Sequence, residues 1–277
     1  MSPAQAPFTG RERAAASPRL ACRDLDPLEL IAVAVWSFAV SFAGGLVGLV
    51  LGNLRLPLIV LVGSSPAAAA GANVAISGAA ALTSAYAHWR GGRINWRLFA
   101  WMAPTSLLGA IAGGLIAGVL PERILLGAIA LVILYGAVEV ARYRRPEGGE
   151  QMPTRTELFL NAALVGFGVG LLGGFVGLIL GSLRLPAMVK WAGIGPYAAV
   201  GTNAAVGVVV GVGGLLGHLP SGIDWEIFAV GAAAAMPAAY LGSRFTGRLD
   251  EGQLIRAMAV VLMVSGLAMA AQAIFGD

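Results

Sequence analysis

The sequence is poor in the residues on which soluble enzymes depend. Only 12% of its 277 residues are charged, whereas soluble domains carry about a quarter. There are two histidines and a single cysteine, Cys22, which excludes an intrachain disulfide and a cysteine-based metal cluster. The motifs of zinc proteases, serine hydrolases and P-loops do not occur either. These absences argue against an enzyme, and we expect neither a cofactor nor a metal site.

Apolar sequence takes the place of the missing charge. Hydrophobic residues make up 58% of the chain, and the mean hydropathy is +0.81. The 40 glycines point in the same direction, because membrane helices use glycine for close packing whereas soluble helices avoid it. The composition therefore predicts an all-α, polytopic membrane protein with the lipid bilayer as its main partner.

The excess of positive charge does not indicate nucleic-acid binding. Every basic residue except Lys190 is an arginine, and the arginines gather in the gaps between apolar runs. The positive-inside rule places basic residues in such gaps, so we expect no nucleic-acid partner. Residues 1–27 are rich in Ala, Pro and Arg and lack the pattern of a secretory signal. We predict that they form a disordered N-terminal tail.

Eight apolar stretches are long enough to cross a bilayer, which takes about 20 residues. They cover 28–50, 66–88, 98–119, 122–142, 157–180, 196–217, 226–247 and 255–275. The stretches 51–65 and 181–195 are apolar but too interrupted for plain spans. We expect each of these two to be a half-helix or a re-entrant turn.

The interrupted stretches belong to an internal duplication. Residues 44–57 and 173–186 are identical at 11 of 14 positions, and both end in Leu-Arg-Leu-Pro. The match continues at least as far as His88 and His218. We predict two tandem repeats, at 28–142 and 157–275, each with about four membrane segments, and a charged linker at 143–156. We favour eight segments, and four crossings in each repeat would make the repeats parallel, but the count of Lys and Arg does not decide the orientation. The unequal charge of equivalent loops fits inverted repeats instead, if each begins with a re-entrant hairpin.

Arg55 and Arg184 are the main candidates for a binding site. A charge inside a membrane span costs at least ~2.5 kcal/mol on insertion scales and suggests a function. The planar guanidinium suits the oxygens of sulfite, sulfonates and carboxylates. Pro57 and Pro186, which follow the arginines closely, can each start a helix whose N-terminus also attracts anions. The alternative is that the arginines snorkel to lipid headgroups or cap a helix end.

Four further residues complete the predicted site. Asn73 and Asn203 can donate to an oxyanion or bridge two helices. Gly52 and Gly181 each end a series of glycines spaced by four, which predicts a continuous packing face on one helix. Broken backbone near these two glycines would line a cavity, since such backbone is tolerated at membrane depth only there.

We predict structural roles, rather than roles in binding, for the other polar residues within or near the apolar stretches. Ser77 is read as an ordinary small residue of a membrane helix. We expect His88 and His218 to be interfacial histidines without partners. Glu139 lies close in sequence to Arg142, and we expect it to take part in an ion pair at a helix end.

At these residues the chain resembles the TauE/SafE family, also called the sulfite exporter or toluene-sulfonate uptake permease family. The resemblance covers roughly 28–275. The resemblance rests on the duplicated glycine-rich segment that ends in Pro57 and Pro186, and on Gly-x-Asn segments at positions where the family often has Gly-Thr-Ser. The chain departs from the family at Arg55 and Arg184, where apolar residues are usual. The resemblance implies a multi-pass protein of the bacterial inner membrane that moves sulfite, organosulfonates or related anions.

These observations predict a secondary transporter of a small anion, with alternating access and a site between the repeats near the membrane midplane. A passive anion channel would use the same residues, and a membrane scaffold subunit without transport activity is a third alternative. The sequence specifies neither the substrate, the direction of transport nor a coupling ion, and it leaves open whether the chain forms a homo-oligomer.

Overall fold

A computed structural model of the chain describes residues 25–64, 66–115, 122–142, 155–176, 178–190, 192–219 and 222–275. All regular structure in these ranges is helical, as the sequence predicts. The helices are α1 (Pro27–Val47), α2 (Gly52–Val62), α3 (Pro66–Arg90), α4 (Trp96–Leu115), α5 (Glu122–Ala141), α6 (Arg155–Val176), α7 (Gly181–Lys190), α8 (Pro196–His218), α9 (Trp225–Thr246) and α10 (Glu251–Phe275). Most of the predicted tail and linker, at 1–24 and 143–154, lies outside the described residues.

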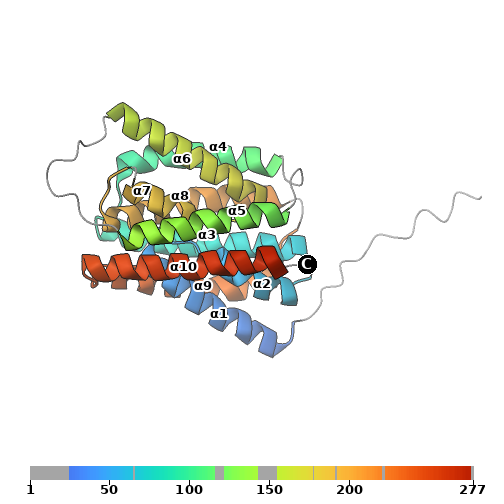
Figure 1. Cartoon of the computed structure of the whole chain (residues 1–277). Helices are drawn as coiled ribbons and strands as arrows, with labels where there is room; N and C mark the ends of the chain where they lie inside the picture. Colours follow the sequence, from blue (N-terminus) through green and yellow to red (C-terminus); the bar gives the residue numbers. More distant parts are fainter. Residues whose placement is uncertain are drawn as a thin grey trace, which may run out of the picture.

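The long helices lie side by side with their axes roughly aligned (Figure 1). Among the described residues, five helices are long and apolar enough to cross a membrane: α1, most of α3, α8, α9 and α10. Large apolar side chains such as Leu131, Leu164 and Val260 point outward and are more than 60% exposed, which suits a surface in contact with lipid. The helices thus support a multi-pass membrane protein, whereas the predicted number of eight spans is not confirmed.

Each half of the chain begins with a long helix followed by a short one. α1 ends at Gly48, which adopts a left-handed conformation with φ of +64°, and residues 49–51 continue without helical structure to α2. Trp36 Nε1 donates a hydrogen bond to the carbonyl oxygen of Leu54 over 2.9 Å. Because Trp36 lies near the middle of α1, α2 must fold back along α1. The short helices α2 and α7 occupy the two interrupted stretches of the sequence.

Two local predictions are wrong. The glycines spaced by four do not form one helical face, because Gly48 ends α1 and Gly52 begins α2. The prolines do not start helices, because Pro57 and Pro186 lie inside α2 and α7. A proline inside a helix leaves the carbonyl four residues earlier without its usual donor. In α2 this is the carbonyl of Asn53, which accepts a hydrogen bond from Gln272 Nε2 at 3.1 Å.

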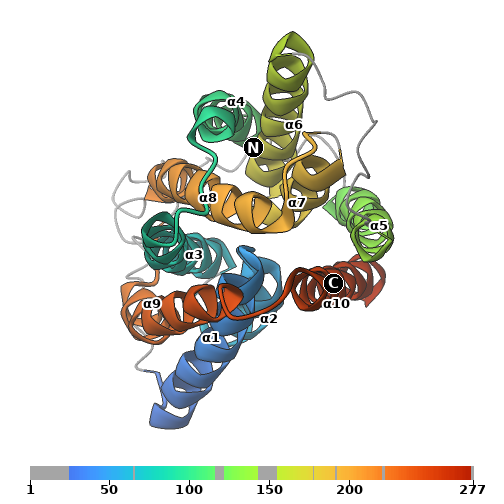
Figure 2. The ribbon, with the colours of Figure 1, turned by 90° about the vertical axis from the view of Figure 1, so that its left-hand side faces the viewer.

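Equivalent helices of the two halves run in opposite directions. α3 and α8 pack against each other at the centre of the molecule (Figure 2). The start of α3, at Gly71, lies against Gly222 beyond the end of α8, and the start of α8, at Gly201, lies against Arg93 beyond the end of α3. α5 and α10 are also antiparallel, since Gly127 faces Ala273 near opposite ends of the two helices. The repeats are therefore inverted rather than parallel, which decides an orientation that the sequence left open.

The two halves exchange their outer helices. α1 packs along α9, and its counterpart α6 packs along α4. The backbones touch at glycines: a Cβ atom on Gly45 would collide with the backbone of Ala239, and one on Gly170 with the backbone of Ser106. Within this arrangement Arg55 and Arg184 of the two Leu-Arg-Leu-Pro elements lie in the interior, whereas Pro57 is exposed.

Candidate functional site

The guanidinium group of Arg55 is buried at the junction of α1, α2 and α3. Its side chain is 2% exposed. Nε donates to Oδ1 of Asn73 at 3.0 Å, Nη1 to Oγ of Ser41 at 3.3 Å, and Nη2 to Oγ of Ser77 at 2.6 Å. Nη2 also lies 3.5 Å from the carbonyl oxygen of Asn73. Neutral oxygen atoms of α1 and α3 thus hold this cation of α2, which does not snorkel to the surface.

Arg184 occupies the equivalent place in the second half. It is 1% exposed, and its Nε donates to Oδ1 of Asn203 at 3.1 Å. Its Nη2 is buried and has no hydrogen-bond partner among the described residues. The two arginines therefore share one contact, the Nε–asparagine hydrogen bond, and differ at Nη2.

The asparagines link each arginine to the first turn of its short helix. Asn73 Nδ2 donates to the carbonyl oxygen of Gly52 at 3.0 Å. Asn203 Nδ2 donates to the carbonyl oxygen of Gly181 at 3.1 Å and also to that of Gly48, in the other half, at 2.8 Å. Each amide group thus accepts from a guanidinium and donates to the backbone at a helix start. The link from Asn203 to Gly48 joins the two halves at this point.

Gly52 and Gly181 allow these asparagines to approach. A Cβ atom on Gly52 would lie 3.1 Å from Nδ2 of Asn73 and 2.8 Å from Oγ of Ser77. A Cβ atom on Gly181 would lie 3.0 Å from Nδ2 of Asn203. Such distances are too short for a side chain without local movement. All six residues predicted for the site therefore lie in two equivalent clusters, one in each half, although their role in binding remains a prediction.

The electrostatics of the two clusters are unusual. No described carboxylate forms an ion pair with either guanidinium, and the described ion pair, between Lys190 and Glu139, involves neither of them. Burying a charge without an opposite charge is costly. In addition, α2 and α7 begin at the clusters, and a helix N-terminus carries a partial positive charge. Both clusters therefore favour negative charge.

The space beside Arg55 is small. A cavity of about 20 Å³ is lined by Arg55, Ser41, Ser77 and Ser84, with Ala204 contributed by the other half. This volume accommodates about one water molecule. A larger and mostly apolar cavity of about 360 Å³ lies between α5, α6 and α7, where it is lined by Leu183, Pro186 and Lys190 among others.

Sequence reasoning missed two residues of the first cluster, Ser41 and Ser77. Serine is common in membrane helices, and neither residue lies in a motif, so no local pattern distinguishes them. Their spacing offers a partial signal, because Ser77 follows Asn73 by four residues and therefore lies on the same side of α3.

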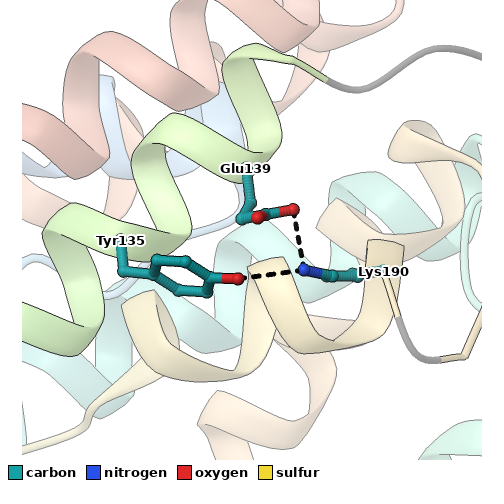
Figure 3. A network of polar contacts seen from close by, with 3 residues as sticks. All are labelled: Tyr135, Glu139 and Lys190. Atoms are coloured by element: carbon teal, nitrogen blue, oxygen red, sulfur yellow. Dashed lines mark hydrogen bonds and ion pairs between the residues drawn. The ribbon is translucent and has the colours of Figure 1, made fainter.

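The other polar predictions are only partly met. Glu139 forms an ion pair, but its partner is Lys190 rather than Arg142. Nζ of Lys190 lies 2.8 Å from Oε2 of Glu139 and donates to the hydroxyl of Tyr135 at 3.1 Å (Figure 3). His88 is fully buried rather than interfacial, because α3 is packed between helices of both halves. His218 has a partner, since its Nδ1 lies 2.9 Å from the carbonyl oxygen of Gly214.

Within the described ranges, no group of His, Cys, Asp or Glu side chains is arranged to hold a metal ion. The clusters offer hydrogen-bond donors and positive charge instead. The chemistry that these groups can perform is the reversible binding of an anion.

Comparison with known proteins shows the family of the chain. Residues 33–269 match the family model described as sulfite exporter TauE/SafE. The chain is 27% identical over 242 residues to the probable membrane transporter protein YjnA of Bacillus subtilis (strain 168), a match that covers 82% of this chain and 95% of the relative. No solved structure matches the chain.

Proposed function

Because the chain belongs to the sulfite exporter TauE/SafE family, a family of membrane transporters, we propose that it is a secondary transporter of a small sulfur oxyanion such as sulfite or an organosulfonate. The observation that carries this proposal is a pair of buried guanidinium groups, one from each half, that no described carboxylate neutralises. The family supports transport across a membrane. The choice of an anion rests on the two arginines.

The proposed site consists of the two clusters and lies between the inverted halves. Arg55 and Arg184 supply positive charge, Asn73 and Asn203 orient the guanidinium groups, and Gly52 and Gly181 admit the asparagines to the starts of α2 and α7. A sulfite or sulfonate group carries three oxygen atoms, and a guanidinium presents several donors in one plane. A few donors at fixed positions can therefore replace part of the hydration shell of the anion.

Two observations support a transporter rather than a passive channel. The cavity at Arg55, at about 20 Å³, is too small for an oxyanion with three oxygen atoms, so the described residues around this cluster leave no room for a continuous pore. The inverted relation of the halves is the arrangement in which exchange of their conformations opens a central site to alternate sides of the membrane. We place the protein in the bacterial inner membrane, as the family implies.

The test is uptake of labelled sulfite and of an organosulfonate into liposomes that contain the purified protein. We expect Arg55→Gln and Arg184→Gln each to reduce the initial rate at least about tenfold, because each removes a charge that favours the anion in a desolvated site. Arg248→Gln is the matched control, since this exposed arginine lies between α9 and α10 and forms part of neither cluster. Thermal unfolding of each variant in detergent shows whether it is folded.

Three results would contradict the proposal. Uptake at the wild-type rate by both folded arginine variants would remove these residues from the site. A rate that rises linearly with anion concentration, without saturation, would favour the channel. Absence of uptake of any tested anion by the wild-type protein would favour a scaffold subunit.

A further inference from the structure

The two arginine clusters differ in their hydroxyl groups. Ser41 in α1 corresponds to Gly170 in α6, at the offset of 129 that aligns Arg55 with Arg184. Ser77 in α3 corresponds to Gly207 in α8, at the offset of 130 that aligns Asn73 with Asn203. Both serines that hold Arg55 are thus glycines around Arg184, whereas the arginines, asparagines and helix-start glycines are the same in both halves.

This difference explains the unequal hydrogen bonding of the guanidinium groups. Nη2 of Arg55 donates to Ser77 over 2.6 Å. The equivalent atom of Arg184 is buried and has no hydrogen-bond partner among the described residues. A buried charged donor without a partner destabilises a folded protein. Such a group needs a specific explanation, and a ligand that accepts from the charged donor supplies one.

We propose that the transported anion is bound directly by Nη2 of Arg184, whereas Arg55 supplies charge and holds α1, α2 and α3 together without contacting the anion. This inference rests on the proposed function and divides its site into one binding arginine and one positioning arginine. The ligand is a small oxyanion whose oxygen accepts from Nη2 at the place that Oγ of Ser77 takes at Arg55. The two halves are then related in fold but differ in function, because only the arginine of the second half contacts the anion.

Several features make Arg184 suited to this role. Its Nε is fixed by Asn203, which in turn donates to Gly48 of the first half. The orientation of the guanidinium therefore depends on the contact between the halves, which is the contact that must change in alternating access. At Arg55, by contrast, Nε, Nη1 and Nη2 each donate to a side chain of the first half. An anion there would have to displace Ser77.

The substitution Gly207→Ser tests the assignment, because it places a hydroxyl at the position equivalent to that of Ser77, which bonds Arg55 in the first half. Gly207→Ala is the matched control: a Cβ atom at this position lies 3.1 Å from Cγ2 of Val50 in either variant, so both meet the same small crowding. Position 170 does not allow this test, since a Cβ atom there collides with the backbone of Ser106.

The measurement is the sulfite concentration that gives half-maximal uptake in liposomes, together with the sulfite-induced shift of the unfolding temperature in detergent. We expect Gly207→Ser to raise the half-saturating concentration roughly tenfold relative to Gly207→Ala, as for competition with one charge-assisted hydrogen bond. The unfolding temperature without sulfite should be higher in Gly207→Ser than in Gly207→Ala, because Nη2 gains a partner. Ser77→Ala should lower the unfolding temperature and change the half-saturating concentration less than Gly207→Ser does.

Equal half-saturating concentrations in the serine and alanine variants at position 207 would overturn the assignment while leaving the proposed function intact. If Gly207→Ser does not fold, Ser77→Ala decides alone, since a roughly tenfold fall in its half-saturating concentration, from loss of the hydroxyl that competes for Nη2 of Arg55, would assign the anion to Arg55. Wild-type protein that shows no saturable uptake would overturn the proposed function and this inference with it.

Discussion

Asn203→Asp places a negative charge beside Arg184 with almost no change in shape. Oδ1 of Asn203 already lies 3.1 Å from Nε of Arg184, so a carboxylate at this position would pair directly with the guanidinium. The substitution therefore tests whether the net positive charge of the second cluster is what binds the anion. Asn203→Leu has a similar volume and serves as the uncharged control.

The size of the effect follows from Coulomb's law. Two unit charges ~4 Å apart at an effective dielectric constant of ~20 interact by about 4 kcal/mol. An anion bound at Arg184 would meet a neutral pair instead of a cation, and about 4 kcal/mol corresponds to about a thousandfold in affinity. The new ion pair stabilises the fold, but the introduced carboxylate cannot donate to Gly48 and Gly181, and each unpaired carbonyl costs about 1–3 kcal/mol. These terms nearly offset each other, so the variant should remain folded.

Titration of uptake and of the unfolding temperature with sulfite measures both quantities. The aspartate variant should unfold near the wild-type temperature and show no sulfite-induced shift at concentrations that saturate the wild type. The leucine variant should be less stable but retain a measurable shift, because Arg184 keeps its charge. A wild-type half-saturating concentration in the aspartate variant would refute the argument that uncompensated charge at Arg184 attracts the anion.

Two further predictions concern the fold. In α6, Gly170→Ala should lower the unfolding temperature by several degrees, because its methyl group would collide with the backbone of α4. Gly168→Ala should leave the unfolding temperature unchanged, because no atom lies within 4 Å of its added carbon. Equal stability of the two variants would contradict the packing of α4 on α6. In a protein with Cys22 replaced by serine, single cysteines that replace Arg90 and Leu219 should react with a membrane-impermeant maleimide from opposite sides of the membrane. The reason is that these residues lie at the ends of the antiparallel helices α3 and α8. Labelling of both from the same side would show that the repeats are parallel.

Much of the candidate site could be predicted because its signals are local. An arginine in an apolar run of the chain stands out whatever surrounds it, since the cost of burying its charge depends on the run itself. The duplication then pairs Arg55 with Arg184 and Asn73 with Asn203 without any knowledge of the fold. The hydrogen bonds from each Nε to its asparagine, over 3.0 and 3.1 Å, join residues that this duplication had already selected.

The predictions that failed depend on how the chain turns. A glycine every fourth residue looks the same in one continuous helix and in two helices joined at Gly48, and only the left-handed backbone there distinguishes them. The prediction of Arg142 as the partner of Glu139 failed for a similar reason. The actual partner, Lys190, is 51 positions away and reaches Glu139 only through the packing of α7 on α5. Neighbours in sequence, such as Arg142, are the partners that a linear pattern favours.

The sequence by itself thus determined that the protein is an all-helical membrane protein with a duplicated element that carries an arginine in each copy, because composition and the length of apolar runs are properties of short segments. The burial of both arginines emerged only from the tertiary structure. Only the tertiary structure decided that the halves are inverted and that Ser41 and Ser77 hold Arg55 while nothing equivalent is described at Arg184. The physical reason is that a hydrogen bond needs two atoms about 3 Å apart, and the crossing of α1, α2 and α3 sets that distance. The unpaired donor that distinguishes Arg184 is a consequence of packing between helices far apart in the chain.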